Sequence, residues 1–251
     1  MRKSARQDQI LDILKEKKVV RVTNLASLFN TSSLTIRKDL NELGEKGKVY
    51  RTYGGATQVH AVEAPLQERR KKNEHIKYTL SGKALDLIHD GDSIFIDGGT
   101  TTEQLAGQLS GFSKLSVITT GLNIVSALQP YDNITIYVPE GRIDHKAFSI
   151  AGSRAEAALQ KYNARITFFG IDGITIEQGL LNDSYEATAI SHIMLNNAQV
   201  RVLLTDSSKF GKISPIGLCT LGGIDILITD SGLPDQFRAA FEAAGVRIII
   251  A

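Results

Sequence analysis

Apolar side chains recur at helical spacing in three short segments of the first 45 residues. Ile36, Leu40 and Leu43 share one face of the third segment, which predicts a helix packed on a small core. The first two segments have similar apolar faces, formed by Ile10, Leu11, Ile13 and Leu14 and by Leu25, Ala26, Leu28 and Phe29. Thr23 and Ser32 precede the second and third segments and are of the types that cap helix N-termini. Three short helices in this order are typical of a helix-turn-helix.

The opposite face of the third helix carries groups suited to DNA. Arginine and lysine bind guanine edges and phosphates, asparagine binds adenine, and an apolar side chain contacts the thymine methyl group. Helical spacing brings these types together at Leu34, Arg37, Lys38 and Asn41. The candidate DNA-binding residues of this segment are Ser33, Leu34, Thr35, Arg37, Lys38 and Asn41. The alternative is an ordinary amphipathic helix with a solvated charged face.

A segment of alternating side chains follows the third helix. Residues 48–53 read Lys-Val-Tyr-Arg-Thr-Tyr and are followed by Gly54 and Gly55, which predicts a strand closed by a turn. Such a strand is typical of the wing of a winged helix and would carry Arg51 to the DNA backbone or minor groove. Arg51 is therefore a further candidate DNA-binding residue.

Beyond residue 75, apolar runs alternate with helical patterns. The predicted strands are residues 93–97, 115–119, 134–138, 165–171, 200–205, 224–229 and 246–250, and the clearest helical segments are 76–89, 102–109 and 235–244. This alternation is typical of a largely parallel sheet flanked by helices, the α/β class.

Small and polar residues follow most of these predicted strands. In open α/β sheets, ligands bind beyond the carboxyl ends of the strands. The loops there are rich in glycine, which lets the backbone approach a ligand, and in hydroxyl and N–H donors for an anion. The candidate effector-binding residues are Asp97, Gly98, Gly99, Thr100, Thr101, Thr102, Thr119, Thr120, Gly141, Asp172, Gly173, Glu186 and Lys209. We expect the threonines to bind a phosphate with Lys209, and the carboxylates to accept sugar hydroxyls. Ordinary turn chemistry is the alternative for each loop taken singly.

Charge separates the two parts of the chain. Residues 1–57 contain twelve Lys and Arg against six Asp and Glu, a net charge of +6, and because the whole chain carries +2 the remaining residues carry −4. A basic amino-terminal module is suited to a phosphate backbone. We expect a winged helix-turn-helix domain at 1–57, a linker at 58–74 and an effector-binding α/β domain at 75–251. The charged run 69–72 is expected to be solvated, with contact to DNA as the alternative.

Several kinds of site are not expected. Gly98, Gly99 and Thr100 lack the third glycine of a dinucleotide motif and the lysine of a P-loop, so we expect no nucleotide cofactor. The five histidines have no ligand spacing, and we expect no metal. Cys219, the single cysteine, is expected to be a small buried apolar group. No apolar run reaches membrane-spanning length and no secretion signal is visible, so a cytoplasmic protein is expected.

Two sets of residues resemble the DeoR family of bacterial transcription regulators. The first set comprises Ser32, residues 35–40 (Thr-Ile-Arg-Lys-Asp-Leu), Gly47, Arg51 and residues 54–56 (Gly-Gly-Ala). The second set comprises Arg69, residues 91–102 and residues 206–211, which look like the family's sugar-phosphate-sensing domain. The chain departs from the family pattern at Thr31, at Lys38 and at residues 139–141. The resemblance implies a small winged helix-turn-helix followed by a larger, mostly parallel α/β domain similar in fold to ribose-5-phosphate isomerase.

The resemblance implies a sequence-specific DNA-binding regulator, a repressor of a sugar uptake or catabolism operon. Its partners would be a double-stranded DNA operator and a phosphorylated sugar, and it would act as a homodimer or homotetramer. The alternative is a sugar-phosphate isomerase or deaminase with a DNA-binding appendage, in which Asp172, Glu186 and Lys209 would supply the base and the cation. Gly173 follows Asp172 where the isomerase loop typically has a second acidic residue, so we expect no enzyme activity.

Overall fold

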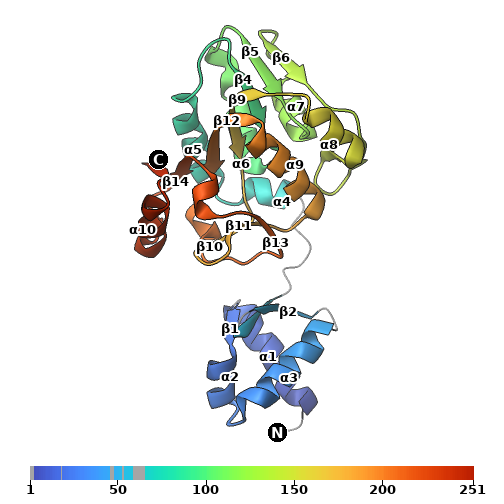
Figure 1. Cartoon of the computed structure of the whole chain (residues 1–251), viewed down its shortest axis with the longest axis vertical. Helices are drawn as coiled ribbons and strands as arrows, with labels where there is room; N and C mark the ends of the chain where they lie inside the picture. The colour runs from blue at the N-terminus through green and yellow to red at the C-terminus, as the bar shows by residue number, and fades with distance from the viewer. Residues whose placement is uncertain (1–2, 18, 46–47, 53, 59–65) are drawn as a thin grey trace. The chain divides into compact units, whose positions relative to one another are not determined.

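The computed structural model describes residues 3–17, 19–45, 48–52, 54–58 and 66–251 (Figure 1). The chain divides into two units, Met1–Glu63 and Ala64–Ala251, and each has an apolar core of its own. The boundary between the units falls inside the segment 58–74, which the sequence analysis assigns to a linker.

Three helices and a small sheet make up the amino-terminal unit. The elements are α1 (Lys3–Lys17), β1 (Val19–Arg21), α2 (Val22–Leu28), α3 (Ser33–Glu45), β2 (Val49–Thr52) and β3 (Gly55–Gln58). Ile10 and Leu14 of α1 pack with Leu25 of α2 and with Ile36 and Leu40 of α3. The three predicted helices are therefore confirmed, and their apolar faces meet as the spacing indicates.

Two details of α2 differ from the prediction. Leu28 is 64% exposed, because α2 ends at this residue and the next one, Phe29, packs against the core instead. Thr23 is not the helix cap, since α2 begins at Val22 and its N-cap is Arg21, which makes no side-chain cap. The chain enters α2 directly from β1, and the Val22 N–H donates to the Gly54 carbonyl at 2.8 Å.

In the small sheet, β3 lies between β1 and β2, and both pairings are antiparallel. Gly54, before β3, has a φ of +87°, which glycine adopts at little cost. Gly55 is required for space, since a Cβ there would lie 2.0 Å from the Val20 carbonyl oxygen. The predicted strand after the third helix is confirmed as β2, while Tyr53, at its expected end, lies outside the described residues.

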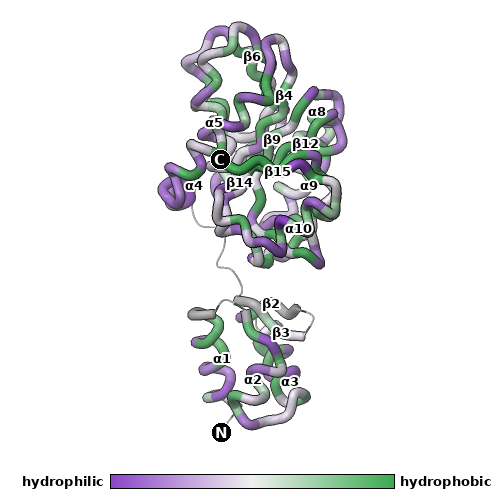
Figure 2. The backbone as a smooth tube through the Cα atoms, turned by 90° about the vertical axis from the view of Figure 1, so that its left-hand side faces the viewer, coloured by the Kyte–Doolittle hydropathy of each residue, from purple (hydrophilic) through white to green (hydrophobic). Residues whose placement is uncertain are grey.

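A seven-stranded parallel sheet forms the centre of the second unit, in the order β15-β14-β12-β9-β4-β5-β6. Its strands are β4 (Ser93–Ile96), β5 (Leu115–Ile118), β6 (Ile134–Tyr137), β9 (Ala164–Phe169), β12 (Ala198–Leu204), β14 (Ile226–Thr229) and β15 (Arg247–Ile250). Each strand overlaps one of the seven predicted runs. Figure 2 shows hydrophobic residues along the labelled strands of this sheet.

Helices cover both faces of this sheet, which confirms the α/β class. Successive strand residues point to opposite faces, so Ile94 and Ile96 pack against one helical layer and Phe95 against the other. The first layer contains α5 (Glu74–Leu85), α6 (Thr100–Ala106) and α7 (Leu122–Leu128), and the second contains α8 (Ser153–Leu159), α9 (Tyr185–Asn196) and α10 (Asp235–Ala243). In the part of the chain that the structure describes, no helix has the length and apolarity needed to cross a membrane.

The sequence pattern missed several short elements. They are the sheet of β10 (Gly173–Thr175), β11 (Gly179–Asn182) and β13 (Ile216–Cys219), the hairpin of β7 (Arg142–Asp144) and β8 (Ser149–Ala151), and the 3-10 helices η1 (Leu109–Gly111), η2 (Ser207–Lys209) and η3 (Leu221–Gly223). Helix α4 (Leu66–Lys71) occupies part of the expected linker. The charged run there is only partly solvated, because Arg70 donates to both carboxylate oxygens of Glu103 at 2.6 and 2.9 Å.

Candidate functional site

The exposed face of α3 carries the candidate DNA-binding side chains. Ser33, Arg37, Lys38 and Asn41 are exposed, and Leu34 is 62% exposed. Thr35 is half-buried. Since the opposite face of α3 packs in the core, the helix presents two cations, an amide and an apolar group on one surface.

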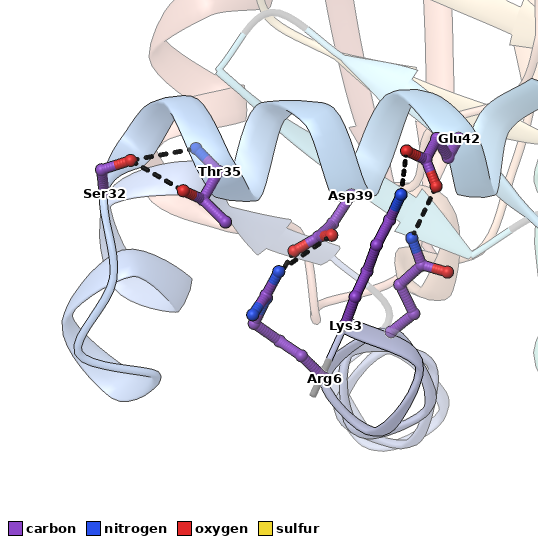
Figure 3. A network of polar contacts seen from close by, with 7 residues as sticks. Lys3, Arg6, Ser32, Thr35, Asp39 and Glu42 are labelled. Carbon is purple, nitrogen blue, oxygen red and sulfur yellow. Dashed lines mark hydrogen bonds and ion pairs between the residues drawn. The ribbon is translucent and has the colours of Figure 1, made fainter. Parts of the chain in front are cut away.

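The start of α3 is fixed by the cap that the sequence predicts (Figure 3). The Thr35 N–H donates to Ser32 Oγ at 3.1 Å, and the two hydroxyls of Ser32 and Thr35 lie 2.9 Å apart. The Ser32 side chain therefore satisfies one of the free N–H groups of the first turn. Thr35, listed among the DNA-binding candidates, takes part in this cap through both its main chain and its side chain.

Ion pairs attach α3 to α1, as Figure 3 shows. Asp39 is only 1% exposed and accepts hydrogen bonds from Arg6 Nε at 2.5 Å and Arg6 Nη2 at 3.2 Å. Hydrogen bonding to Asp39 raises the pKa of Arg6. Glu42, one turn further along, is bound by Lys3 and by Gln7. The sequence analysis missed the Arg6–Asp39 pair, although helical spacing places Asp39 beside Ile36 and Leu43 on the inward side of α3.

Arg51 belongs to β2, the strand predicted to form a wing. Its main chain pairs with Ala56 of β3. The Arg51 side chain lies outside the described part of the structure, so its contact with DNA stays a prediction.

The second candidate site lies where the order of the sheet reverses. From β4 the chain adds β5 and β6 on one side and then crosses to add β9, β12, β14 and β15 on the other. The carboxyl ends of β4 and β9 are therefore adjacent, and the Asp97 N–H after β4 donates to the Phe168 carbonyl of β9 at 3.0 Å. Such a switch point is the usual location of a ligand crevice in doubly wound folds.

The loop after β4 places three threonines in a buried position. Thr100 and Thr101 are each 8% exposed, and Thr102 is fully buried. The Thr102 hydroxyl donates to the carbonyls of Asp97 and Gly99 at 2.7 and 2.9 Å. Thr102 was expected to bind a phosphate, but its hydroxyl hydrogen is used in hydrogen bonds that stabilise the conformation of residues 97–99. Thr100 and Thr101 stay as candidates for contact with a phosphate.

Three of the candidate glycines are explained by packing between loops. A Cβ at Gly98 would lie 3.3 Å from the Gly121 Cα, and a Cβ at Gly173 would lie 2.3 Å from the Lys212 carbonyl oxygen. At Gly141, a Cβ would lie 2.6 Å from the Ile150 side chain. The sequence analysis attributes these glycines to the approach of a ligand, whereas here the approaching group is another part of the protein.

Charged groups gather beyond β9 and β12. Lys209 Nζ lies 3.7 Å from Asp172 Oδ1, and the Asp183 N–H donates to Asp172 Oδ2 at 3.0 Å. Burial raises the pKa of Asp97, with a further contribution from the charge of Asp172. Burial alone would raise the pKa of Asp206, but hydrogen bonds from Ser208 and Asn73 and the charge of Lys209 lower it below its ordinary value. The structure therefore brings Asp97, Asp172 and Lys209 together, as predicted from the positions of their loops.

Other candidates lie at the edge of this group or act within the fold. Thr119 is fully buried, and its hydroxyl accepts a hydrogen bond from the Gly121 N–H at 3.0 Å. The Thr120 carbonyl accepts from the Ile150 N–H of β8 at 2.8 Å. Glu186, in the first turn of α9, is bound by Arg142 of β7 at 2.7 and 2.9 Å. Its carboxylate is thus already held by a cation of the β7–β8 hairpin.

The sequence analysis did not include α5 in the effector site. Asn73, which precedes α5, donates from Nδ2 to Asp206 Oδ1 at 2.9 Å. Lys77, one turn later, is only 5% exposed. The signal was present in the sequence, because Lys77 precedes Leu80 and Ala84 by three and seven residues and so shares their buried helix face, where a lysine is unusual.

The single cysteine lies in a less buried position than the sequence pattern predicts. Cys219 is half-buried rather than fully buried, and burial raises the pKa of its thiol to about 11. A thiol with this pKa is a poor nucleophile near neutral pH. Within the described ranges, no three or more His, Cys, Asp and Glu side chains group closely enough to hold a metal ion.

Comparison with solved structures finds two folds with partial similarity to this chain. Ribose-5-phosphate isomerase A from Methanocaldococcus jannaschii covers 55% of this chain and is itself covered to 55%, with 20% identity and a TM-score of 0.41. Translation initiation factor eIF-2B from Pyrococcus horikoshii covers 86% of this chain and is covered to 69%, with 17% identity and a TM-score of 0.42.

Comparison of sequences gives a clearer result. IolR, an HTH-type transcriptional regulator of Bacillus subtilis, is 30% identical over 87% of both chains, and GolR of Listeria innocua is 29% identical over 98% of both. The glycerol-3-phosphate regulon repressor of Escherichia coli is 28% identical over 93% of both. Residues 6–62 match the DeoR-like helix-turn-helix domain and residues 72–231 match the DeoR C-terminal sensor domain. The chain therefore belongs to the DeoR family of DNA-binding transcriptional regulators.

Proposed function

We propose that this regulator represses a sugar operon and that a phosphorylated sugar, bound by the second unit, controls its affinity for DNA. The observation that carries the proposal is the pairing of an exposed basic face on α3 with a buried group of charged side chains and hydroxyls at the switch point of the sheet. A relative's name, glycerol-3-phosphate regulon repressor, supports a ligand that contains a phosphate.

In the proposed DNA complex, α3 enters the major groove. Arg37 and Lys38 would bind guanine edges or phosphates, Asn41 would bind adenine, and Leu34 would contact a thymine methyl group. Ser33 stands at the start of α3, where an exposed hydroxyl can reach a phosphate. Thr35 contributes by capping the helix, and we assign Arg51 to the backbone or minor groove.

In the proposed effector site, Thr100 and Thr101 bind the phosphate together with the N–H groups of their loop. Lys209 adds a positive charge. Its ammonium group lies 3.7 Å from the Asp172 carboxylate, too far for a hydrogen bond, so it can move toward an anion while the Asp183 N–H still donates to Asp172. Asp97 and Asp172 accept sugar hydroxyls. Glu186 joins them only if Arg142 releases it, which would tie the β7–β8 hairpin to ligand binding.

Binding of ligand and of DNA are linked in this proposal. A ligand that binds more tightly to one arrangement of the protein favours that arrangement, and DNA affinity changes by the same coupling free energy. We propose a homodimer or homotetramer, because one recognition helix contacts few base pairs and paired half-sites multiply specificity. The protein would act in the cytoplasm, where its operator is.

We further propose that the second unit senses its ligand without converting it. The relatives compared above are named as regulators. Asp172, the carboxylate best placed to act as a base, is engaged by Lys209 and by the Asp183 N–H. Incubation with aldose and ketose phosphates should leave them unchanged, and saturable turnover of any of them would overturn this assignment.

The test is operator binding by the full-length protein at a fixed salt concentration, because phosphate contacts make the affinity depend on salt. Fluorescence anisotropy with labelled DNA from upstream of the gene should show specific binding that one member of a panel of sugar phosphates weakens. Arg37→Ala should weaken specific binding at least about tenfold, whereas Arg154→Ala, an exposed arginine of α8, should not. Equal operator affinity with and without every sugar phosphate would refute the control mechanism.

A double substitution separates the two units. Thr101→Val with Lys209→Ala should leave operator binding intact and abolish the response to the sugar phosphate. A folded double variant that no longer binds the operator would contradict the division of labour between the units.

A further inference from the structure

A row of polar side chains on α5 faces the loops of the proposed effector site. Asn73, Lys77 and Ser81 are four residues apart and therefore share one face. Asn73 donates to the Asp206 carboxylate at 2.9 Å, and Ser81 Oγ donates to the Thr101 carbonyl at 2.9 Å. One end of the row thus contacts the loop after β12, and the other end contacts the first turn of α6, which follows the loop after β4.

Lys77 lies between these two anchors and is a buried cation. It is 5% exposed, and its ammonium group donates to the Arg69 carbonyl. The charged groups that act on it are Asp206, Lys209, Arg69 and Lys72. Burial is the largest influence and lowers the pKa of Lys77 to about 8; the three cations act in the same direction and Asp206 opposes them.

This environment favours an additional anion. A buried ammonium group is unfavourable unless negative charge and hydrogen-bond acceptors surround it. Here the charges of Lys209, Arg69 and Lys72 all act on Lys77 in the unfavourable direction, and the carboxylate that acts on it, Asp206, also receives hydrogen bonds from Asn73 and Ser208. A dianion near Lys77 and Lys209 would balance this positive charge.

We infer that Lys77 is an effector-binding residue that, with Lys209, binds the dianionic phosphate group of the ligand. The inference rests on the proposed function and deepens it, because it adds α5 to the elements that line the proposed effector site. Thr101 is within this arrangement, since its main chain is held by Ser81. The phosphate would then lie between the Thr100–Thr101 loop, the loop after β12 and the polar row of α5.

A measurable consequence is proton uptake on binding. At pH 8 a lysine with a pKa of about 8 is partly neutral, and a nearby dianion raises its pKa, so binding draws a proton from solution. At pH 6.5 the same lysine is already charged and takes up none. Lys212 is a second possible source of uptake, because burial and the charge of Lys209 lower its pKa as well.

The experiment is calorimetric titration of the full-length protein with sulfate, whose charge does not change in this range. Measurements in two buffers of different ionisation enthalpy give the number of protons taken up. We expect about half a proton at pH 8 and almost none at pH 6.5. Lys77→Arg should retain binding and lose the uptake, because a guanidinium group is always charged. Lys77→Met should bind sulfate at least about tenfold more weakly.

Two control variants make the result specific. Lys212→Arg should keep the uptake if Lys77 is its source. Lys114→Met changes an exposed lysine directly before β5, at the amino end of the parallel strands, and should bind sulfate like the unaltered protein. If Lys77→Met fails to fold, Lys77→Arg and its proton count still decide the question.

The outcomes distinguish this inference from the proposed function. Unchanged sulfate affinity in Lys77→Met, or unchanged proton uptake in Lys77→Arg, would overturn the role of Lys77 even if a sugar phosphate still releases the operator. Sulfate binding that depends on Lys77, combined with no effect of any sugar phosphate on the operator, would support the anion site and refute the proposed function.

Discussion

Removal of the Asp39 carboxylate should unfold the amino-terminal unit while the second unit stays folded. Asp39 is 1% exposed and holds the Arg6 guanidinium, whose side chain is 12% exposed. Asp39→Ala leaves this buried cation without its partner, which costs about 3–5 kcal/mol. A small domain of this size rarely has more than about 3–5 kcal/mol of stability. The substitution therefore removes most of the stability of the helix-turn-helix.

Thermal unfolding of the full-length protein, followed by calorimetry, measures this effect. We expect the transition of the amino-terminal unit to fall by about 10 °C or more, or to disappear, while the transition of the second unit is unchanged. Specific DNA binding should be lost, and the proposed sulfate binding should be retained, because the two units have separate apolar cores.

Glu42→Ala is the matched control on the same helix. Glu42 also binds α1, through Lys3 and Gln7. The Glu42 and Lys3 side chains are 34% and 55% exposed, so solvent screens this ion pair and its loss costs about 0–1 kcal/mol. Loss of the hydrogen bond from Gln7 adds about 1 kcal/mol, which leaves the total below the cost expected for Asp39→Ala. A second test is the double substitution Arg6→Met with Asp39→Leu, which should recover stability because neither charge is left unpaired. If Asp39→Ala and Glu42→Ala have the same stability, burial of the Asp39 pair is not what fixes α3.

Three smaller effects complete the set of predictions. Ser32→Ala should destabilise the amino-terminal unit by about 1 kcal/mol, since it removes the cap of α3; urea unfolding measures this loss, and Ser33→Ala is the control. Gly121→Ala should cost about 1–3 kcal/mol and weaken the response to sugar phosphate, because the new Cβ would lie 2.6 Å from the Gly98 Cα; a normal melting temperature would contradict it. Cys219, with a thiol pKa of about 11, should react slowly with iodoacetamide at pH 8 in the folded protein and at the ordinary rate in urea; equal rates would show that the thiol is not protected.

The central strands β4, β5, β9 and β14 of the main sheet could be predicted because they are buried on both faces. The run Ile94–Phe95–Ile96 is continuously apolar, and its short length and polar flanks distinguish it from a helix. The short strands β7, β8, β10, β11 and β13 each contain a glycine or a polar residue within their three or four positions, which leaves no apolar run long enough to recognise. Helix α4 could not be predicted from the sequence for another reason. Its charged residues are paired only in the folded chain, as Arg70 is with Glu103.

Single residues were misjudged where the fold gives a polar group an unusual environment. Helical spacing places Asp39 and Lys77 on inward faces, yet both are residue types that are usually solvated. Asp39 is buried because Arg6 lies opposite it. Lys77 is buried because α5 closes over the loops after β4 and β12. In both cases the residues that bury the charged group include segments distant in the sequence, Arg6 for Asp39 and the loop after β12 for Lys77, and only the tertiary structure identifies them.

The two candidate sites also differ in how much of each the sequence determines. The DNA-binding face depends on one helix, and a spacing of three and four residues is sufficient to group Arg37, Lys38 and Asn41. The effector site depends on loops that follow β4, β5, β9 and β12, and these loops are neighbours only because the sheet has the order β12-β9-β4-β5. In a sheet whose strands followed the order of the chain, β4 would lie at an edge and Asp97 would be far from Asp172. The reversal between β4 and β9 is therefore the feature that brings these separate turn sequences together, and it also places α5, which directly precedes β4, beside them, as the proposed site requires.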